Sequence, residues 1–193
     1  MKIRGLVSTS LAAAALAAAL AGQAMGDNGH GHGRGHDDRQ KPHSGDLVRA
    51  VRETTRRFHD VNVAKAEGYQ LLFGCVSGPD DGAMGLHYVN LGLVADGVLD
   101  PERPEIVIYE PTPNGGRRLI GADYLVFSET WHASNQATPQ IMGQLMHLID
   151  APNRYGLPSF YTLHVWAWKP SPTGAFVNWH ADVSCEHFDG GEE

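Results

Sequence analysis

The sequence predicts an α+β fold in which a long N-terminal helix packs on a curved antiparallel sheet of about four strands. Three observations lead to this prediction: helical apolar spacing near the N-terminus, later segments rich in β-branched and aromatic residues, and an Asn-Gly hairpin signal. Because hairpins join antiparallel strands, a helix on one face of the sheet gives an α+β arrangement. A sheet that curls around the helix forms a cone-shaped roll with a pocket, whereas a flat sheet covered by helices has none.

The N-terminal segment, residues 1–26, has the layout of a secretory signal peptide. Lys2 and Arg4 precede a short run of mostly Ala and Leu, and small residues follow at Gly22 and Ala24. The run is shorter than the roughly 20 apolar residues that a membrane-spanning helix needs. We therefore expect export to a periplasm or to the extracellular space, with no membrane span.

Residues 27–45 read "DNGHGHGRGHDDRQKPHSG" and offer almost no apolar side chain to bury. We expect a disordered arm here, followed by a single globular domain over residues 46–193. Histidines of this arm, among them His30, His32 and His36, can bind metal ions non-specifically whether or not metal binding is the role of the protein.

The charge balance argues against nucleic acid as a partner. The 193 residues carry 15 Lys and Arg against 22 Asp and Glu, for a formal net charge of −7, and removing Lys2 and Arg4 with the leader makes the chain more acidic. An acidic chain without a basic stripe repels a phosphate backbone.

The first predicted element is a helix over residues 46–67. Asp46 can cap its N-terminus, Leu47 and Val51 begin an apolar stripe with helical spacing, and Gly68 supplies the stop.

The segments that follow have a different pattern. Predicted strands lie in "LHYVNLGLV", "PEIVIYEP", "RRLIGADYLVF" and "FYTLHVWAWKP", and "TPNGG" joins the second and third of these as a hairpin. The segment "TPQIMGQLMHLI" predicts a second helix, with Thr138 as its cap and Pro139 at its first position.

Two cysteines, Cys75 and Cys185, remain to be assigned. In an oxidising compartment an even pair most simply forms one disulfide, which is the pairing we expect. The alternative is that Cys185 binds a metal ion together with His180 and His187.

Three predicted strands each place one ionisable group among apolar neighbours. Alternate residues of a strand share a face, so His87, Glu110 and His164 each point to an apolar side. Buried charges and imidazoles must be hydrogen-bonded, paired or bound to metal. Two histidines and one carboxylate are a common set for a divalent ion such as zinc or copper, so we predict an exported protein that binds a metal ion, or a small molecule through one, at His87, Glu110 and His164.

Other functions fit the same residues. An enzyme of the lyase or hydrolase type would use His87 with Tyr88 or Glu110 for acid–base chemistry. A structural envelope protein would use the two histidines only as hydrogen-bonded core residues. The sequence lacks G-x-S-x-G, H-E-x-x-H, a Walker loop and C-x-x-C, which argues against the common enzyme classes that these signatures mark.

The segments "GAMGLHYVN", "PEIVIYEP" and "NWHADVSC", taken together, resemble a group of small exported bacterial proteins that has no assigned activity. A G-x-M-G-x-H-Y-x-N segment around His87 is the most specific part of the resemblance. The resemblance implies export and a single domain, and it assigns no role to any residue.

Overall fold

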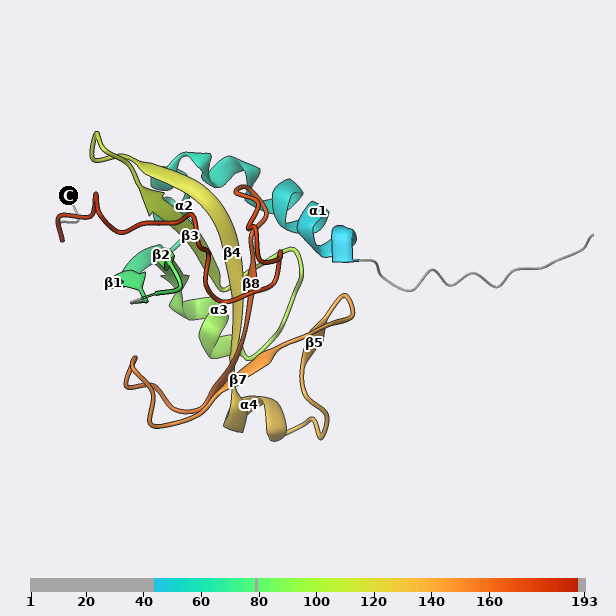
Figure 1. The fold of residues 1–193 in the computed structure, drawn as a ribbon. Coiled ribbons are helices and arrows are strands. Elements are labelled where there is room, and N and C mark those ends of the chain that lie inside the picture. Colours follow the sequence, from blue (N-terminus) through green and yellow to red (C-terminus); the bar gives the residue numbers. More distant parts are fainter. Residues whose placement is uncertain (1–43, 79, 191–193) are drawn as a thin grey trace, which may run out of the picture. The chain divides into compact units, whose positions relative to one another are not determined.

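The computed structural model describes residues 44–78 and 80–190 (Figure 1). The chain divides into two units, Met1–Asp37 and Asp38–Glu193, and every described element belongs to the second. The predicted signal peptide and nearly all of the predicted arm therefore lie outside the described residues. The end of the arm is the exception, because it already belongs to the first helix.

The predicted single N-terminal helix is divided into three helical segments. They are α1 (Ser44–Thr55), the 3-10 helix η1 (Arg56–His59) and α2 (Val61–Ala66). The chain leaves the helical conformation at Asp60, which is extended at φ −90° and ψ 108° and accepts a hydrogen bond from the backbone N–H of Asn62 at 2.9 Å. An aspartate that caps a new helix in this way ends the preceding one. The expectation of one continuous helix over residues 46–67 is therefore wrong, although Leu47 and Val51 are buried as predicted.

Six antiparallel strands form the main sheet, in the spatial order β1-β2-β3-β4-β8-β7. Their bounds are β1 Tyr69–Ser77, β2 Ala83–Asn90, β3 Ile106–Pro111, β4 Arg117–Phe127, β7 His147–Ile149 and β8 Phe160–Val165. The α+β class is confirmed, but with six strands rather than about four. The predicted hairpin joins β3 and β4, where the backbone N–H of Thr112 donates to the Gly116 carbonyl at 3.0 Å.

The second predicted helix, over residues 138–149, is wrong. This segment forms β5 (Gln140–Ile141), β6 (Gln144–Leu145) and β7. Met142 and Gly143 have φ values of 45° and 81°, so they turn the chain between β5 and β6, and this left-handed backbone is incompatible with a continuing helix. The helix in this part of the chain comes earlier, as the short α4 (Ser128–His132).

Different parts of the chain cover the two faces of the main sheet. On one face, Val51 of α1 belongs to a buried apolar cluster with Tyr124 of β4 and Leu163 of β8, and Figure 1 shows α1 beside these strands. The opposite face packs against α3 (Leu91–Asp96) and the C-terminal segment through Val94 and Val183. The pocket described below lies on this second face. The expected cone-shaped roll, with a pocket between a long helix and the sheet, is therefore not the arrangement found.

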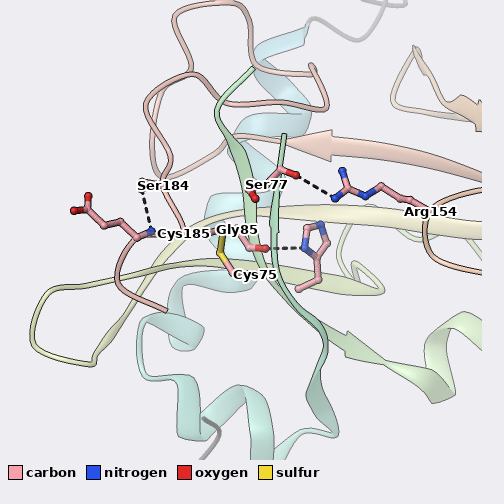
Figure 2. Close-up of a disulfide and its surroundings, with 8 residues drawn as sticks. Cys75, Ser77, Gly85, Arg154, Ser184 and Cys185 are labelled. Atoms are coloured by element: carbon pink, nitrogen blue, oxygen red, sulfur yellow. Dashed lines mark hydrogen bonds between the residues drawn. A yellow bond between two sulfur atoms is a disulfide. The ribbon is translucent and has the colours of Figure 1, made fainter. Parts of the chain in front are cut away.

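Cys75 and Cys185 form the predicted disulfide, with their Cα atoms 5.7 Å apart and a sequence separation of 110. The bond fastens the C-terminal segment to β1, next to Gly85 of β2 (Figure 2). It excludes the alternative of Cys185 as a metal ligand, since the ligand form of cysteine is a thiolate. In the described part of the chain, no helix is both long and apolar enough to cross a bilayer.

Candidate metal centre

Three ionisable side chains from three strands meet on the face that packs against α3. His87 belongs to β2, Asp123 to β4 and His164 to β8, and one ligand atom from each lies within 4.8 Å of the other two. All three residues are buried. The strand register explains why these side chains are close together. Asp123 of β4 lies directly opposite His164 of β8, and His87 of β2 lies opposite Ile108 of β3, the strand between β2 and β4.

The backbone at Gly85 fixes the orientation of the His87 ring. Nδ1 of His87 lies 3.2 Å from the Gly85 carbonyl oxygen, and a contact with this acceptor requires Nδ1 to carry the hydrogen. Nε2 of the neutral ring then keeps its lone pair, and it lies 3.4 Å from Nε2 of His164. Gly85 has φ 89°, and a Cβ atom there would lie 2.5 Å from the Tyr109 carbonyl oxygen, so this position requires glycine.

Asn90 closes the same segment and positions the helix that borders the pocket. Its side-chain oxygen accepts hydrogen bonds from the backbone N–H groups of Gly92 and Leu93 at the start of α3. Its side-chain nitrogen donates to the Glu67 carbonyl at 3.0 Å. The stretch "GAMGLHYVN" thus supplies both an oriented histidine and the cap of a neighbouring helix.

Asp123 faces the other nitrogen of the His164 ring. Nδ1 of His164 lies 3.7 Å from Oδ1 of Asp123, too far for a hydrogen bond. This buried nitrogen has no hydrogen bond of good geometry among the described residues, although the Asn178 side chain interacts with the His164 ring. The carboxylate itself is held firmly: Oδ1 accepts from the Thr162 hydroxyl at 2.7 Å and from the Leu163 backbone N–H at 3.0 Å. A fixed carboxylate beside an unsatisfied buried imidazole nitrogen is typical of a site that receives an ion or a ligand.

Burial keeps both imidazoles neutral near physiological pH. Desolvation and the neighbouring His164 lower the pKa of His87 to about 4, and desolvation lowers the pKa of His164 to about 3. Desolvation raises the pKa of Asp123 to about 6, against the opposing effect of His87 and the hydrogen bond from Thr162. At neutral pH the cluster therefore offers two neutral imidazoles and one carboxylate, which are the forms that bind a transition metal.

A cavity of about 110 Å³ adjoins the cluster. Its lining includes His87, Asp123 and His164 together with Thr162 and Asn178, and is otherwise almost entirely apolar. The side-chain oxygen of Asn178 is buried and, within the described residues, has no hydrogen bond of good geometry, its polar interaction there being with the His164 ring. A few polar side chains with incomplete hydrogen bonding therefore line an otherwise apolar cavity, the usual composition of a small-ligand site.

Glu110 lies outside this cluster, contrary to expectation. Its carboxylate forms ion pairs with Arg118 and with Lys169, whose Nζ lies 2.7 Å from Oε1. Because Ile108 is the residue opposite His87, Glu110 lies two positions farther along β3, where its cross-strand partner is Arg118. The structure therefore brings together His87 and His164 of the predicted trio and places the carboxylate of the third elsewhere.

Tyr88 also lies away from the cluster. It points to the opposite face of β2 and packs against Tyr109, with ring centroids 5.0 Å apart. Neither Tyr88 nor Glu110 is therefore placed to act with His87 as an acid–base pair. The arm histidines His30, His32 and His36 lie outside the described residues.

Asp123 belongs to the candidate site but was not among the predicted ligands. In "RRLIGADYLVF" it alternates with Leu125 and Phe127, so it too is an ionisable group on an apolar strand face. The same strand alternation that selected Glu110 could therefore have selected Asp123. Leu125 and Phe127 both line the cavity.

Comparison with known proteins provides no relative for this chain. No protein-family model, no curated protein and no solved structure matches it. The inference of function therefore depends on the geometry of the cluster and its cavity.

Proposed function

We propose that this chain is an exported binding protein that holds one divalent transition-metal ion, zinc or copper, between His87, Asp123 and His164. The observation that carries the proposal is the 3.4 Å separation of the two Nε2 atoms. Two nitrogens bound at about 2.0–2.1 Å to one tetrahedral ion are about 3.3–3.4 Å apart, so the rings already have the spacing of two ligands on one ion.

The tautomers support the same proposal. The Gly85 carbonyl holds the hydrogen of His87 on Nδ1, so Nε2 of His87 presents its lone pair to Nε2 of His164, 3.4 Å away. With the hydrogen of His164 on Nδ1, both Nε2 atoms present lone pairs to each other inside a buried site. Such an arrangement is unfavourable until a cation lies between the lone pairs, and depressed pKa values disfavour a proton in that role.

The ligand types narrow the choice of ion. Two imidazoles and a carboxylate suit zinc and copper(II), whereas calcium and magnesium prefer sites made of oxygen atoms alone. Three protein ligands leave at least one coordination position open, and the adjoining cavity is where a further ligand would lie.

Export is part of the proposal. The disulfide between Cys75 and Cys185 fits an oxidising compartment, where such bonds persist. The signal layout of residues 1–26 provides the independent sequence argument.

The test is metal stoichiometry in the mature protein. The four arm histidines, His30, His32, His36 and His43, are replaced by serine so that the arm cannot contribute. We expect about one zinc per chain after dialysis against a weak chelator, and none in His87→Ala or His164→Ala, since losing one ligand of three removes most of the affinity. His187→Ala is the control, because it removes an exposed histidine away from the cluster. A metal-free parent protein that takes up no zinc, copper or other transition ion would refute the proposal.

A second candidate function follows from the order in which Asp123, His164 and His87 contact one another. Asp123, His164 and His87 form a series in which the carboxylate is 3.7 Å from the first ring and the rings are 3.4 Å apart. Such a series can move a proton without a metal ion, which keeps a lyase or hydrolase activity as the alternative, with Asp123 in place of Glu110 or Tyr88. Substrate turnover that persists in chelator-treated protein and disappears in Asp123→Asn would favour it.

A further inference from the structure

We propose that the cavity beside the proposed metal ion takes a small monocarboxylate with an apolar body, and that the carboxylate binds the open position of the ion. This inference rests on the proposed function and names the ligand class of the same site. Its support comes from the distribution of polar groups, the charge of the site, the size of the cavity and the position of its mouth.

The polar groups of the cavity are gathered at one end. Asp123 accepts from Thr162 and faces His164, and His164 in turn faces His87. Apolar side chains such as Leu72, Val89, Val94, Leu125, Leu157 and Phe160 form most of the remaining lining. A ligand that matches this lining has a single polar head, which lies against the cluster, and an apolar body.

The charge of the site selects an anionic head. A divalent ion bound by one carboxylate and two neutral imidazoles leaves one positive charge unbalanced. Among the described residues that line the cavity, Asp123 is the only carboxylate, and none is a lysine or an arginine. A net charge in an apolar cavity is costly, so a ligand that brings one negative charge is favoured over a neutral or cationic ligand of the same shape.

The volume limits the size of the body. An apolar cavity of about 150 Å³ accommodates benzene, and the cavity here measures about 110 Å³. The body enclosed by the cavity is therefore a short aliphatic chain, whereas single-ring carboxylates and long-chain fatty acids are too large to be enclosed.

Two exposed apolar side chains mark the mouth. Phe73 of β1 and Leu91 at the start of α3 both line the cavity and are 52% and 49% exposed. Phe73 lies where the pairing of β1 with β2 is interrupted, and has a left-handed φ of 66°, which is rare for an aromatic residue. Its ring packs edge-on against Tyr155, with centroids 5.6 Å apart. The cavity thus reaches solvent between apolar groups, which suits entry of the apolar body.

The experiment uses the full mature chain with intact disulfide, the four arm histidines replaced by serine, and one equivalent of zinc or cobalt(II). Calorimetric titrations compare hexanoate with acetate, hexanamide and hexylammonium, and benzoate serves as a carboxylate whose ring is too large for the cavity. We expect hexanoate to bind at least about tenfold more tightly than acetate, because its extra methylene groups are buried, and at least about tenfold more tightly than the amide or the amine. Binding should shift the visible spectrum of the cobalt(II) protein and should be absent without metal.

A variant that fills the cavity provides a second readout. Leu157→Trp should weaken hexanoate binding at least about tenfold while zinc stays at one per chain, because the cavity loses volume but no metal ligand. Leu145→Trp is the matched control, since Leu145 is 64% exposed and is not part of the lining. Acetate binding as tightly as hexanoate, a preference for the amide or amine, or equal binding without metal would overturn the inference while leaving the metal site standing. Absence of stoichiometric metal overturns the proposed function, and the inference with it.

Discussion

The carbonyl oxygen of Gly85 lies 3.2 Å from Nδ1 of His87, although the two residues are only two positions apart in one strand. In a regular strand the carbonyl lies in the plane of the sheet and the side chains stand perpendicular to it. The contact therefore depends on the left-handed backbone of Gly85, at φ 89°. A local distortion of β2 sets which nitrogen of His87 is available for a metal ion.

Gly85→Ala should lower both stability and metal affinity. An added Cβ would meet the Tyr109 carbonyl oxygen at 2.5 Å and would also strain the positive φ, so we expect a loss of about 2–4 kcal/mol in unfolding free energy. Zinc affinity should fall at least about tenfold, because the His87 ring loses its fixed orientation. Urea unfolding and competition with a zinc indicator measure the two effects.

Gly115→Ala is the control for backbone strain alone. Gly115 has φ 77° in the β3–β4 hairpin, and a Cβ there would meet nothing within 4 Å. We expect a loss of about 1 kcal/mol with unchanged zinc affinity. Equal losses at the two glycines would contradict the argument that close packing at Gly85 supports the site.

His164→Ala should remove metal binding but cost the metal-free protein little. Nδ1 of His164 makes no hydrogen bond of good geometry in the described part of the chain, and the ring borders an existing cavity, so we expect a change within about 1 kcal/mol. In the parent protein, free zinc at 100 times Kd should add about 2.7 kcal/mol, and this increment should vanish in the variant.

Leu163, the neighbour of His164 in β8, provides a contrasting variant. Leu163 points to the other face, where it is buried in the cluster with Val51, so Leu163→Ala should cost about 2–5 kcal/mol with zinc stabilisation retained. Thermal unfolding with and without zinc distinguishes the two variants. A loss of several kcal/mol in metal-free His164→Ala would indicate that His164 is a structural core residue.

The sequence was informative where local pattern and tertiary structure agree. Strand alternation placed His87 and His164 on apolar faces, and the register brings both to one face of the sheet. The Asn-Gly hairpin and the disulfide likewise follow from local or compositional rules that tertiary packing does not override.

The rest depended on information that pattern reasoning lacks. The choice between Glu110 and Asp123 is set by register, because a slip of two residues along a strand moves a side chain about 7 Å without changing its face. The long helix ends because the Asp60 carboxylate binds a local backbone N–H, and the helix predicted over residues 138–149 competes with a turn at Met142 and Gly143. Apolar spacing alone does not distinguish these outcomes.

Replacing both cysteines by serine, at positions 75 and 185, should destabilise the fold by about 2–4 kcal/mol. The disulfide closes a long loop and fastens the segment that carries Asn178 beside the cavity. Intact mass of the parent protein should be about 2 Da below the fully reduced value, and reductant should lower the Tm of the parent protein only. Two alkylatable thiols in unreduced, denatured parent protein would show that the bond does not form.

Glu105 should make stability fall as pH rises above the ordinary range of a carboxyl group. The residue is 1% exposed, and Oε2 accepts a hydrogen bond from the Leu125 backbone N–H at 3.0 Å. Burial raises the pKa of this carboxyl from 4.5 to about 8, so between these values the folded protein holds a proton that the unfolded chain has released. Unfolding free energy then decreases with pH in that window, with a slope from this group of up to about 1.4 kcal/mol per pH unit.

Glu105→Gln tests this contribution without removing the acceptor. Glutamine keeps an oxygen for the Leu125 N–H and cannot ionise, so the variant should be more stable relative to the parent at pH 8 than at pH 5. Urea unfolding of chelator-treated protein at a series of pH values gives the difference between the two curves. The other buried titrating groups, His87, Asp123 and His164, are present in both proteins, so their effects largely cancel in that difference.

Glu102→Gln, at an exposed position three residues earlier, should leave the parent curve unchanged. A difference curve that is flat from pH 5 to pH 8 would mean that Glu105 ionises in the folded protein at its ordinary pH, and that the apolar interior around it is open to water.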